Sequence, residues 1–484
     1  MTQGALDDSP YLLPNTPKAV GTLHFIGIGG VGMSALALAL QQNGYKVQGS
    51  DLSHSPTIET LKRAGIPVFH KHAARNVGGA QTIIVSSAIK ARNVELTFAK
   101  QQNRTILKRG QLLGLMTQNK PTIAITGSHG KTTTTSLTGK LLIAANADPL
   151  ILTGGLMQDY QSNVYLGKGK FLVAEMDESD GSHRNAHPFI GVVTNIDQEH
   201  MAFYKTKKEL LRSFEVFFDN LTKDGTGIAC LDNPLVQELM PHLHTPLLTY
   251  GTSPKAQVRL TNIKPQPEGF AFDAFMPDGS CLKDLLLSLH GHHNVLNAGA
   301  ALTIAFQLGL NEETIRYAFQ DFRGVKRRFQ TTGTLNSVRI IDDYAHHPTE
   351  IKATLETAKQ LCRGRLFAVC EPHRYTRLQD LFEDFADALK VADCVITVPV
   401  YSAGESPIQG VSSPLLTEEI TNKGTKSLSV NTFDDVADYL HKHLRKDDLV
   451  ICMGAGKITQ LAHMLPTSAQ QAKTAGNLAH APKH

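Results

Sequence analysis

A short β-branched run, a glycine or polar turn and a helical period follow one another repeatedly in three blocks of this 484-residue chain. The blocks open with the apolar runs at 22–28, 122–126 and 338–341. In the third block we also expect strands at 366–370 and 449–453 and one helix at 378–391. Strands that alternate with helices form parallel, doubly wound sheets, because each crossover helix must cover a face of the sheet. The length allows two to four domains with full-sized cores. The pattern therefore predicts an α/β protein.

We predict three domains. Residues 1–118 should form a Rossmann-like domain, 119–328 a central mixed α/β domain with a phosphate loop, and 329–484 a second Rossmann-like domain. Residues 257–289 have short strand patterns with Pro and Gly turns, which indicates a local β insertion. The polar, non-periodic tail from about residue 466 is expected to be disordered.

Composition excludes several classes of protein. Hydrophobic residues make up 41% and charged residues 19% of the chain, which argues against disordered, collagen-like and membrane proteins. The net charge of +4 is too small to imply nucleic acid. The N-terminus lacks a secretory signal pattern, and the six cysteines never form Cys-x-x-Cys, so reduced thiols are expected. We therefore expect a cytoplasmic protein with neither nucleic acid nor membrane as a partner.

The first block contains a Gly-x-Gly-x-x-Gly motif at residues 27–32, between a strand and a helix. Glycines let the backbone approach a diphosphate, and Asp51, at the end of the next strand, would bind a ribose hydroxyl. A nicotinamide dinucleotide is one ligand of this kind, and close packing without any ligand is the structural alternative. The geometry requires only some nucleotide diphosphate.

The second block carries a stronger signal, TGSHGKTT at 126–133, again between a strand and a helix. Its amides and Lys131 would surround phosphates, and the Thr132 hydroxyl would bind Mg²⁺. The sequence does not match the strict eight-residue phosphate-loop motif, because Ile125 stands at the position of its first glycine. We interpret the motif as a shortened phosphate loop that begins at Gly127.

Two acidic clusters follow this loop. EMDESD begins with Glu175 at the end of a buried strand, where a carboxylate can hold Mg²⁺ opposite Thr132. The second cluster, TNIDQEH, ends in His200, a candidate ligand of a second metal ion. A solvated acidic turn would explain either cluster alone, but two in succession after a phosphate loop favour a metal site.

Further polar groups gather later in the chain. Asn294 would either cap a helix or contact an adenine edge. In the third block, DDYAHHP and EPHRYTR each follow a strand, where ligands of open α/β sheets bind. Arg374 and Arg377 are suited to forked contacts with carboxylate or phosphate. A solvent-exposed basic surface without a ligand is the alternative.

Taken in order, these motifs resemble the Mur ligase family. The resemblance extends from about residue 22 to 465 and rests on HFIGIGGVGMSALA, GSHGKTTTT, EMDESDGS, TNIDQEHM, HHNVLNAGAA with GVKRRFQ, and DDYAHHPTE with EPHRYTR. It implies a UDP-substrate domain, an ATPase domain and a C-terminal amino-acid domain. The chain departs from the usual pattern at Gly110-Gln111, where Ala-Glu is common.

The resemblance implies a role for each matching residue. ATP would be bound by Gly127, Ser128, His129, Gly130, Lys131, Thr132, Thr133, His293, Asn294, Arg328 and Asp343. Mg²⁺ would be held by Thr132, Glu175 and His200. The UDP substrate would face Gly29, Gly30, Asp51 and Ser86, and the amino acid would face Tyr344, His346, Arg374 and Arg377. The catalytic residues would be Lys131, His346, Arg328 and Asp343.

The implied reaction is the ATP-dependent ligation of L-alanine to the carboxylate of UDP-N-acetylmuramate through an acyl phosphate, with ADP and phosphate as by-products, in peptidoglycan precursor synthesis. The amine needs a general base, and we expect His346 because imidazole titrates near neutrality. The alternatives are a murein-peptide ligase that acts on the same nucleotide, an NAD-dependent oxidoreductase and a non-catalytic nucleotide sensor. The protein is expected to be a monomer or a weak homodimer.

Overall fold

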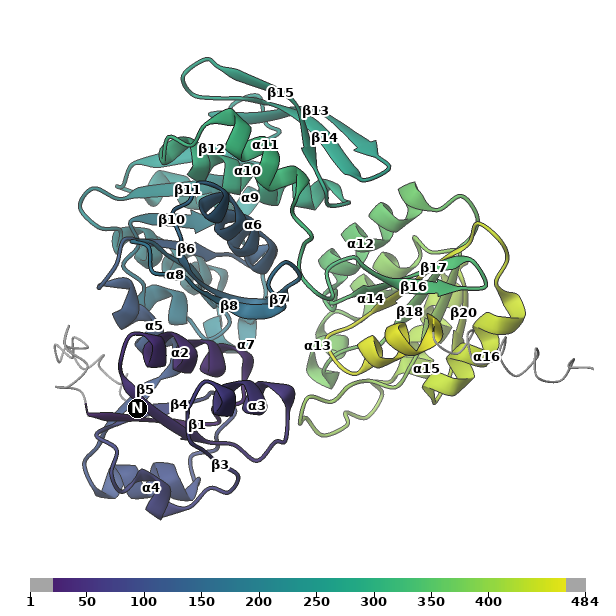
Figure 1. Ribbon diagram of the computed structural model, residues 1–484. Helices are drawn as coiled ribbons and strands as arrows, with labels where there is room; N and C mark the ends of the chain where they lie inside the picture. Colours follow the sequence, from purple (N-terminus) through teal and green to yellow (C-terminus); the bar gives the residue numbers. More distant parts are fainter. Residues whose placement is uncertain (1–20, 467–484) are drawn as a thin grey trace, which may run out of the picture. The chain divides into compact units, whose positions relative to one another are not determined.

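The computed structural model describes residues 21–466, so the N-terminal segment and the predicted disordered tail lie outside the described residues, apart from residue 466. The chain forms two compact units: the first contains the residues up to 288 together with 294–324, and the second contains 289–293 and the residues from 325 onward (Figure 1). Within residues 21–466, no helix combines the length and the apolar character needed to cross a membrane.

The first sheet has five parallel strands in the order β3-β2-β1-β4-β5. The strands are β1 (Thr22–Ile26), β2 (Lys46–Ser50), β3 (Val68–Phe69), β4 (Thr82–Val85) and β5 (Thr105–Lys108). The helices are α2 (Val31–Gln42), α3 (Pro56–Arg63), α4 (Val94–Gln101) and α5 (Arg109–Thr117), with the 3₁₀ turn η1 (Ala74–Val77). The predicted Rossmann-like fold of this part of the chain is confirmed.

The central sheet is mixed and has the strand order β15-β14-β13-β12-β11-β10-β6-β9-β7-β8. Its strands are β6 (Thr122–Thr126), β7 (Leu150–Met157), β8 (Ser162–Leu166), β9 (Leu172–Glu175), β10 (Ile190–Val193), β11 (Thr226–Cys230), β12 (Leu247–Gly251), β13 (Val258–Gln266), β14 (Gly269–Phe275) and β15 (Cys281–Leu287). Its helices are α6 (Lys131–Ala144), α7 (Met201–Tyr204), α8 (Lys207–Asp219), α9 (Pro234–Leu239), α10 (His292–Gln307) and α11 (Glu312–Gln320), with the 3₁₀ turns η2 (Ser182–Asn185) and η3 (Met240–His242). Because β6 lies between β10 and β9, the segments that follow these three strands meet at one edge of the sheet.

The predicted β insertion consists of β13, β14 and β15. The three strands pair antiparallel and extend the central sheet beyond β12, at the end far from α2 and α5 (Figure 1). Alternate residues of β14, among them Phe270, Phe272 and Ala274, are buried, as expected for a strand with one covered face. The insertion therefore enlarges the sheet.

The first sheet and the central sheet pack together inside one compact unit. Gln42 Nε2 in α2 donates a hydrogen bond to Leu166 O in β8 at 2.8 Å. Asn163 Nδ2 in β8 donates to Val31 O, at the start of α2, at 2.7 Å. Apolar residues of both sheets share one core cluster. The glycine-rich helix α2 is therefore held directly against the edge hairpin β7–β8.

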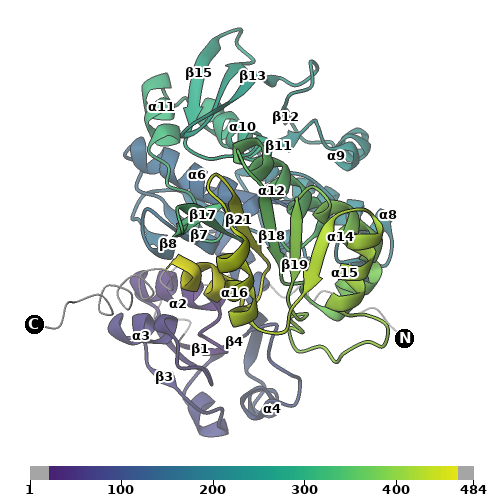
Figure 2. The same cartoon turned by 90° about the vertical axis from the view of Figure 1, so that its right-hand side faces the viewer.

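The second unit contains a six-stranded sheet in the order β16-β17-β21-β18-β19-β20, with only β16 antiparallel. The strands are β16 (Gln330–Leu335), β17 (Val338–Asp343), β18 (Leu366–Cys370), β19 (Cys394–Thr397), β20 (Lys426–Ser429) and β21 (Leu449–Met453). The helices are α12 (Pro348–Leu361), α13 (Tyr375–Asp380), α14 (Phe382–Leu389), α15 (Ser413–Asn422) and α16 (Phe433–His443). Helices α12, α14 and α15 cover one face, and α16 with the helical residues 458–466 covers the other (Figure 2).

One predicted helix of this unit is wrong. The apolar period from 378 to 391 predicts a single helix, but the structure has α13 and α14 with a break at Leu381, whose φ and ψ are −124° and 28°. Neither proline nor glycine stands at the break. Leu378 and Phe385 are both fully buried on the α12 side of the sheet, so tertiary packing overrides the continuous local pattern.

Candidate active site

The phosphate loop connects β6 to α6 at the edge where the central sheet changes strand order. Gly127 and Gly130 have φ values of 128° and 82°, in the region that favours glycine. A Cβ at Gly127 would lie 2.2 Å from Thr194 Oγ1, and a Cβ at Gly130 would lie 2.2 Å from Asn297 Oδ1. Both glycines are therefore required by the backbone conformation and by the close approach of neighbouring elements.

The segment that follows β10 holds this loop in shape. Asn195 Oδ1 accepts a hydrogen bond from His129 N at 2.8 Å. Thr194 Oγ1 and Asn195 Nδ2 both donate to His129 O, at 2.7 and 3.0 Å. Asp197 N donates to Ser128 Oγ at 2.8 Å. The polar motif TNIDQEH thus satisfies the loop backbone and leaves its conformation little freedom.

The side chain of Lys131 folds back onto the phosphate loop. Its Nζ donates to Gly127 O at 2.7 Å and to Ser128 O at 3.0 Å, and lies 2.8 Å from Glu178 Oε2. Burial disfavours the charged ammonium, but the Glu178 and Glu175 carboxylates outweigh it and raise the pKa of Lys131. Burial also opposes the charge of Glu178, yet Lys131 and His200 lower the pKa of that carboxyl group. Lys131 and Glu178 therefore form a charged, nearly buried pair.

Thr132 and Glu175 form the first oxygen-rich cluster. Thr132 Oγ1 donates to Glu175 Oε1 at 3.1 Å, so the first turn of α6 faces the end of β9. The other carboxylate oxygen of Glu175 accepts hydrogen bonds from Thr153 Oγ1 at 3.2 Å and from Gly154 N at 2.6 Å. A hydroxyl and a carboxylate in contact are ligands that Mg²⁺ prefers, and they fit the predicted metal site.

His200 lies in a second cluster, with Glu178 and Glu199. Its Nε2 is 3.5 Å from a carboxylate oxygen of each. One potential ligand atom from each of the three residues lies within 4.8 Å of the others. His200 has a left-handed backbone, with φ of 58°. The predicted set Thr132, Glu175 and His200 therefore belongs to two clusters, and its role as a single metal site stays a prediction.

Asn294 and Asn297 lie near the start of α10, and each is 6% exposed. Asn297 Nδ2 donates to Asn294 Oδ1 at 3.1 Å, and Thr134 Oγ1 donates to Asn297 Oδ1 at 3.4 Å. Since α10 begins at His292, Asn294 is not its N-cap, and the capping alternative is wrong. His293 precedes Asn294 in the helix; contact of either residue with adenine stays a prediction.

In the first sheet, the predicted substrate residues lie beyond the ends of β1, β2 and β4. Asp51 Oδ2 accepts a hydrogen bond from Gly29 N at 2.8 Å, and Asp51 Oδ1 accepts two from Ser53. Burial opposes its charge, but these bonds lower the pKa of Asp51. Asp51 therefore shapes the glycine loop itself. Gly30 is the N-cap of α2, and Ser86 N donates to Ile26 O at 3.2 Å.

In the second unit, the Tyr344 ring lies close to two arginines. The guanidinium carbons of Arg327 and Arg328 lie 4.8 and 5.3 Å from the centre of its ring, a cation–π geometry. Arg328 Nη1 is also 3.7 Å from Glu350 Oε1. The segment that precedes β16 therefore contacts the segment that follows β17.

Asp343, at the end of β17, is buried. Its carboxylate accepts hydrogen bonds from Phe329 N at 2.7 Å and Ala345 N at 2.8 Å. Burial outweighs these bonds and the nearby Arg328, and raises the pKa of Asp343 to about 6. Asp343 therefore connects the segment before β16 to the segment after β17 through these hydrogen bonds. Its contact with ATP stays a prediction.

His346 lies close to Glu350 and Tyr344. Its Nδ1 is 3.1 Å from Tyr344 O and 3.3 Å from Glu350 Oε2. Burial lowers the pKa of His346 to about 3, because the nearby Glu350 carboxylate does not offset it. His346 is therefore neutral at pH 7. The expectation that it titrates near neutrality does not hold in this structure, and its role as the base stays a prediction.

Arg374 and Arg377 lie beyond the end of β18. Arg377 Nη1 is 3.1 Å from His373 Nδ1, and Arg374 Nη1 is 3.6 Å from Glu405 Oε1. The His373 ring stacks on Tyr401, with centroids 5.6 Å apart, and lies 5.5 Å from the His346 ring. The predicted amino-acid residues of the second unit are therefore gathered beyond the carboxyl ends of β17 and β18, the two strands that flank β21.

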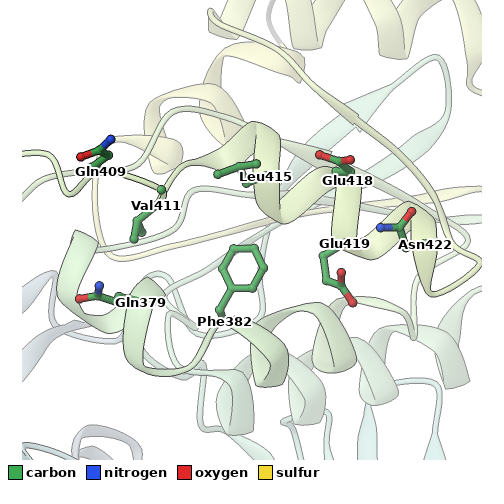
Figure 3. Close-up of a pocket in the computed structure, with 9 residues that line it drawn as sticks. Gln379, Phe382, Gln409, Val411, Leu415, Glu418, Glu419 and Asn422 are labelled. Carbon is green, nitrogen blue, oxygen red and sulfur yellow. The ribbon is translucent and has the colours of Figure 1, made fainter.

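A separate groove of about 500 Å³ lies between α13, α14 and α15 (Figure 3). Phe382, Val411 and Leu415 supply its apolar surface, and Glu418 and Glu419 line one end. None of the residues predicted for the active site lines it.

Three family models match the chain in succession: "Mur ligase family, catalytic domain" at residues 22–121, "Mur ligase middle domain" at 125–305 and "Mur ligase, glutamate ligase domain" at 327–456. The chain belongs to the Mur ligase family. Membership explains why a diphosphate-type glycine loop and a phosphate loop occur in one chain, and the oxidoreductase interpretation is wrong.

Individual Mur ligases resemble the chain over nearly its whole length. It is 43% identical to the UDP-N-acetylmuramate--L-alanine ligase of Rhodospirillum rubrum over 457 residues, which cover 93% of this chain and 95% of that protein. The corresponding ligase of Maricaulis maris is 44% identical, with coverage of 93% and 97%. The crystal structure of the Thermotoga maritima UDP-N-acetylmuramate-alanine ligase superposes with a TM-score of 0.78 at 27% identity, covering 93% of this chain and all of that one.

Sequence reasoning missed several residues that contact the predicted site residues within each unit. They are Glu178, Glu199, Asn297, Glu350 and His373. Glu178 and Glu199 stand inside the two acidic motifs, so the repeated carboxylates were the available signal. Asn297 follows Asn294 by three residues, a spacing that places both on one helix face.

Proposed function

We propose that this Mur ligase uses ATP to join L-alanine to the carboxylate of UDP-N-acetylmuramate, a step of peptidoglycan precursor synthesis. The observation that carries the proposal is identity of 41–44% over 93–94% of the chain with proteins named for this reaction. The phosphate loop also supports the use of ATP, because its lysine is charged and lies where the loop would surround phosphates.

The proposed chemistry proceeds through an acyl phosphate. A carboxylate is a poor electrophile, so its oxygen attacks the γ-phosphorus of ATP and ADP leaves. The alanine amine then attacks the acyl carbon, loses a proton, and expels inorganic phosphate. The Lys131 ammonium would stabilise the negative charge that develops on the transferred phosphoryl group. Its pKa, raised by Glu178 and Glu175 against the effect of burial, keeps that charge in place at neutral pH.

Mg²⁺ fits the donor atoms on this side of the proposed site. Thr132 and Glu175 would hold it beside the phosphates, and the cluster of Glu178, Glu199 and His200 supplies a second set of ligands. When bound, the ion would neutralise phosphate charge and align the γ-phosphoryl group. Lys131 and the loop amides would bind the same phosphates from the protein side.

The second unit would recognise the amino acid. Arg377 and Arg374 offer forked donors for the alanine carboxylate, and Tyr344 lies beside His346 at a centroid distance of 5.2 Å. For His346 to accept the ammonium proton, negative charge on the bound substrates must raise its low pKa. A cytoplasmic location and a monomeric or weakly dimeric state complete the proposal.

Phosphate release in the presence of ATP, Mg²⁺, UDP-N-acetylmuramate and each of the twenty amino acids in turn tests this function. The proposal requires turnover that depends on the nucleotide substrate and is fastest with L-alanine. Turnover with a tripeptide but not with L-alanine would instead identify a murein-peptide ligase. ATP turnover that is independent of both substrates would contradict the proposal.

A further inference from the structure

Arg109 connects the glycine-rich loop of the first sheet to the acidic motif of the central sheet. It is the first residue of α5, which lies beside α2 (Figure 1). Its Nη2 donates to Asp177 Oδ2 at 3.0 Å, and the two side chains are 22% and 39% exposed. Asp177 immediately precedes Glu178, the partner of Lys131. A single side chain thus spans the distance between two predicted ligand sites.

The guanidinium group also lies against the glycine loop. A Cβ at Gly32 would be 3.0 Å from Arg109 Cδ and 3.3 Å from its Nη1, so the last glycine of the motif leaves the room that Arg109 occupies. Gly32 is the second residue of α2, whose N-cap Gly30 makes no side-chain capping bond. The charged group is therefore placed where the UDP diphosphate of the proposed substrate would approach.

The position of Arg109 is fixed by close packing of α5 on η2. A Cβ at Gly110 would lie 2.1 Å from Ser182 Cβ, and a Cβ at Gly114 would lie 2.4 Å from Asn185 O. Ser182 Oγ in turn donates to Asp177 O at 3.0 Å. Gly110, where the family commonly has alanine, thus lets α5 contact the segment that presents Asp177. The close packing of α5 on η2 therefore fixes the position of Arg109 relative to Asp177.

We propose that Arg109 exchanges partners during catalysis: it releases Asp177 and then binds the diphosphate of the UDP substrate. This inference rests on the proposed function. An arginine fork binds a carboxylate or a phosphate in the same geometry, and a diphosphate carries more charge than one carboxylate. A partly exposed ion pair is weak, so Asp177 can be displaced. Arg109 is thus a substrate-binding residue, and Asp177 is a competitor that holds it in position beforehand.

Partner exchange predicts opposite effects for the two residues. Arg109→Ala should weaken the binding of UDP-N-acetylmuramate, measured by calorimetry without ATP, by about tenfold or more, because a charge-assisted contact is lost. Arg109→Lys keeps the charge but not the fork and should fall between. Asp177→Asn should tighten binding by about two- to fivefold, since the competing ion pair is removed. In Arg109→Ala/Asp177→Asn the second change should have no effect.

The matched control is Arg104→Ala. Arg104 precedes β5 and donates to Gly78 O at 3.3 Å, at the opposite end of the strand from Arg109. The Arg104→Ala variant should therefore bind UDP-N-acetylmuramate with unchanged affinity. Circular dichroism checks that each variant is folded. Wild-type affinity in Arg109→Ala, or weaker binding in Asp177→Asn, would overturn the inference even where the wild-type protein ligates L-alanine. Failure of the wild-type protein to ligate L-alanine would instead refute the proposed function.

Discussion

Replacing Lys131 by methionine should destabilise the first unit as well as abolish ligation. Methionine keeps most of the aliphatic stem and removes the ammonium, which is 2.8 Å from Glu178 Oε2. The two side chains are only 16% and 3% exposed. At that distance the Coulomb attraction is about 6 kcal/mol for an effective dielectric constant of about 20. Breaking a buried pair by removing one partner costs about 3–5 kcal/mol, because the other charge is left without compensation.

We expect the lower end of that range, about 3 kcal/mol. His200 Nε2, 3.5 Å from the other oxygen of Glu178, offers the carboxylate some compensation. The chain has no tryptophan, so urea unfolding is best followed by circular dichroism, with hydrogen exchange of peptides from β6 and α6 to locate the change. Ligation should fall by about a thousandfold, because charge stabilisation of the transferred phosphoryl group is lost.

The double variant Lys131→Met/Glu178→Gln separates the two effects. It removes the uncompensated carboxylate, so most of the lost stability should return while ligation remains absent. Glu178→Gln alone should cost less than Lys131→Met, since Lys131 still donates to Gly127 O and Ser128 O. Equal stability of Lys131→Met and the wild-type protein, or a double variant no more stable than Lys131→Met, would refute the assignment of a buried pair.

Three further predictions concern metal binding and protonation. Glu175→Gln should raise the Mg²⁺ concentration for half-maximal ligation about tenfold or more, and an unchanged Mg²⁺ titration would show that Glu175 is no ligand. Because burial lowers the pKa of His346 to about 3 in the free enzyme, kcat/KM should show no inflection near pH 6.5 that His346→Gln abolishes, and such an inflection would contradict this low pKa. Burial raises the folded pKa of Asp343 to about 6, above its ordinary value of 3.8, so its ionisation destabilises the second unit as pH rises from about 4 to 7. Urea unfolding should show this loss, about 2–3 kcal/mol, in the wild-type protein and not in Asp343→Asn; equal pH dependence in both would contradict it.

The sequence predicted the sheets well because strand cores carry local signals. The apolar runs of β6, β18 and β21 were predicted with the bounds that the structure shows. The break at Leu381 escaped prediction, because no glycine or proline marks it and the packing of α13 and α14 decides it. Equally, no local pattern shows that α2 packs on β7 and β8, more than a hundred residues away.

The environment of each charged group was the part that sequence could not give. The pairing of Lys131 with Glu178, 47 positions later, has no local sequence signal. His346 was assigned a pKa near neutrality from its residue type, whereas burial beside Tyr344 and Glu350 lowers it. Residue type and spacing identify which side chains reach a strand end. Their burial and their partners depend on contacts between distant segments.

Transfer of oxygen from the substrate carboxylate tests the central claim most directly. The loop with Lys131, and the pair Thr132 and Glu175, would activate the γ-phosphorus, so the substrate carboxylate must attack that atom. With ¹⁸O in the muramoyl carboxylate, ADP should form and one labelled oxygen should appear in released inorganic phosphate. Label in AMP would indicate an acyl adenylate and would contradict the roles proposed for Lys131 and Thr132.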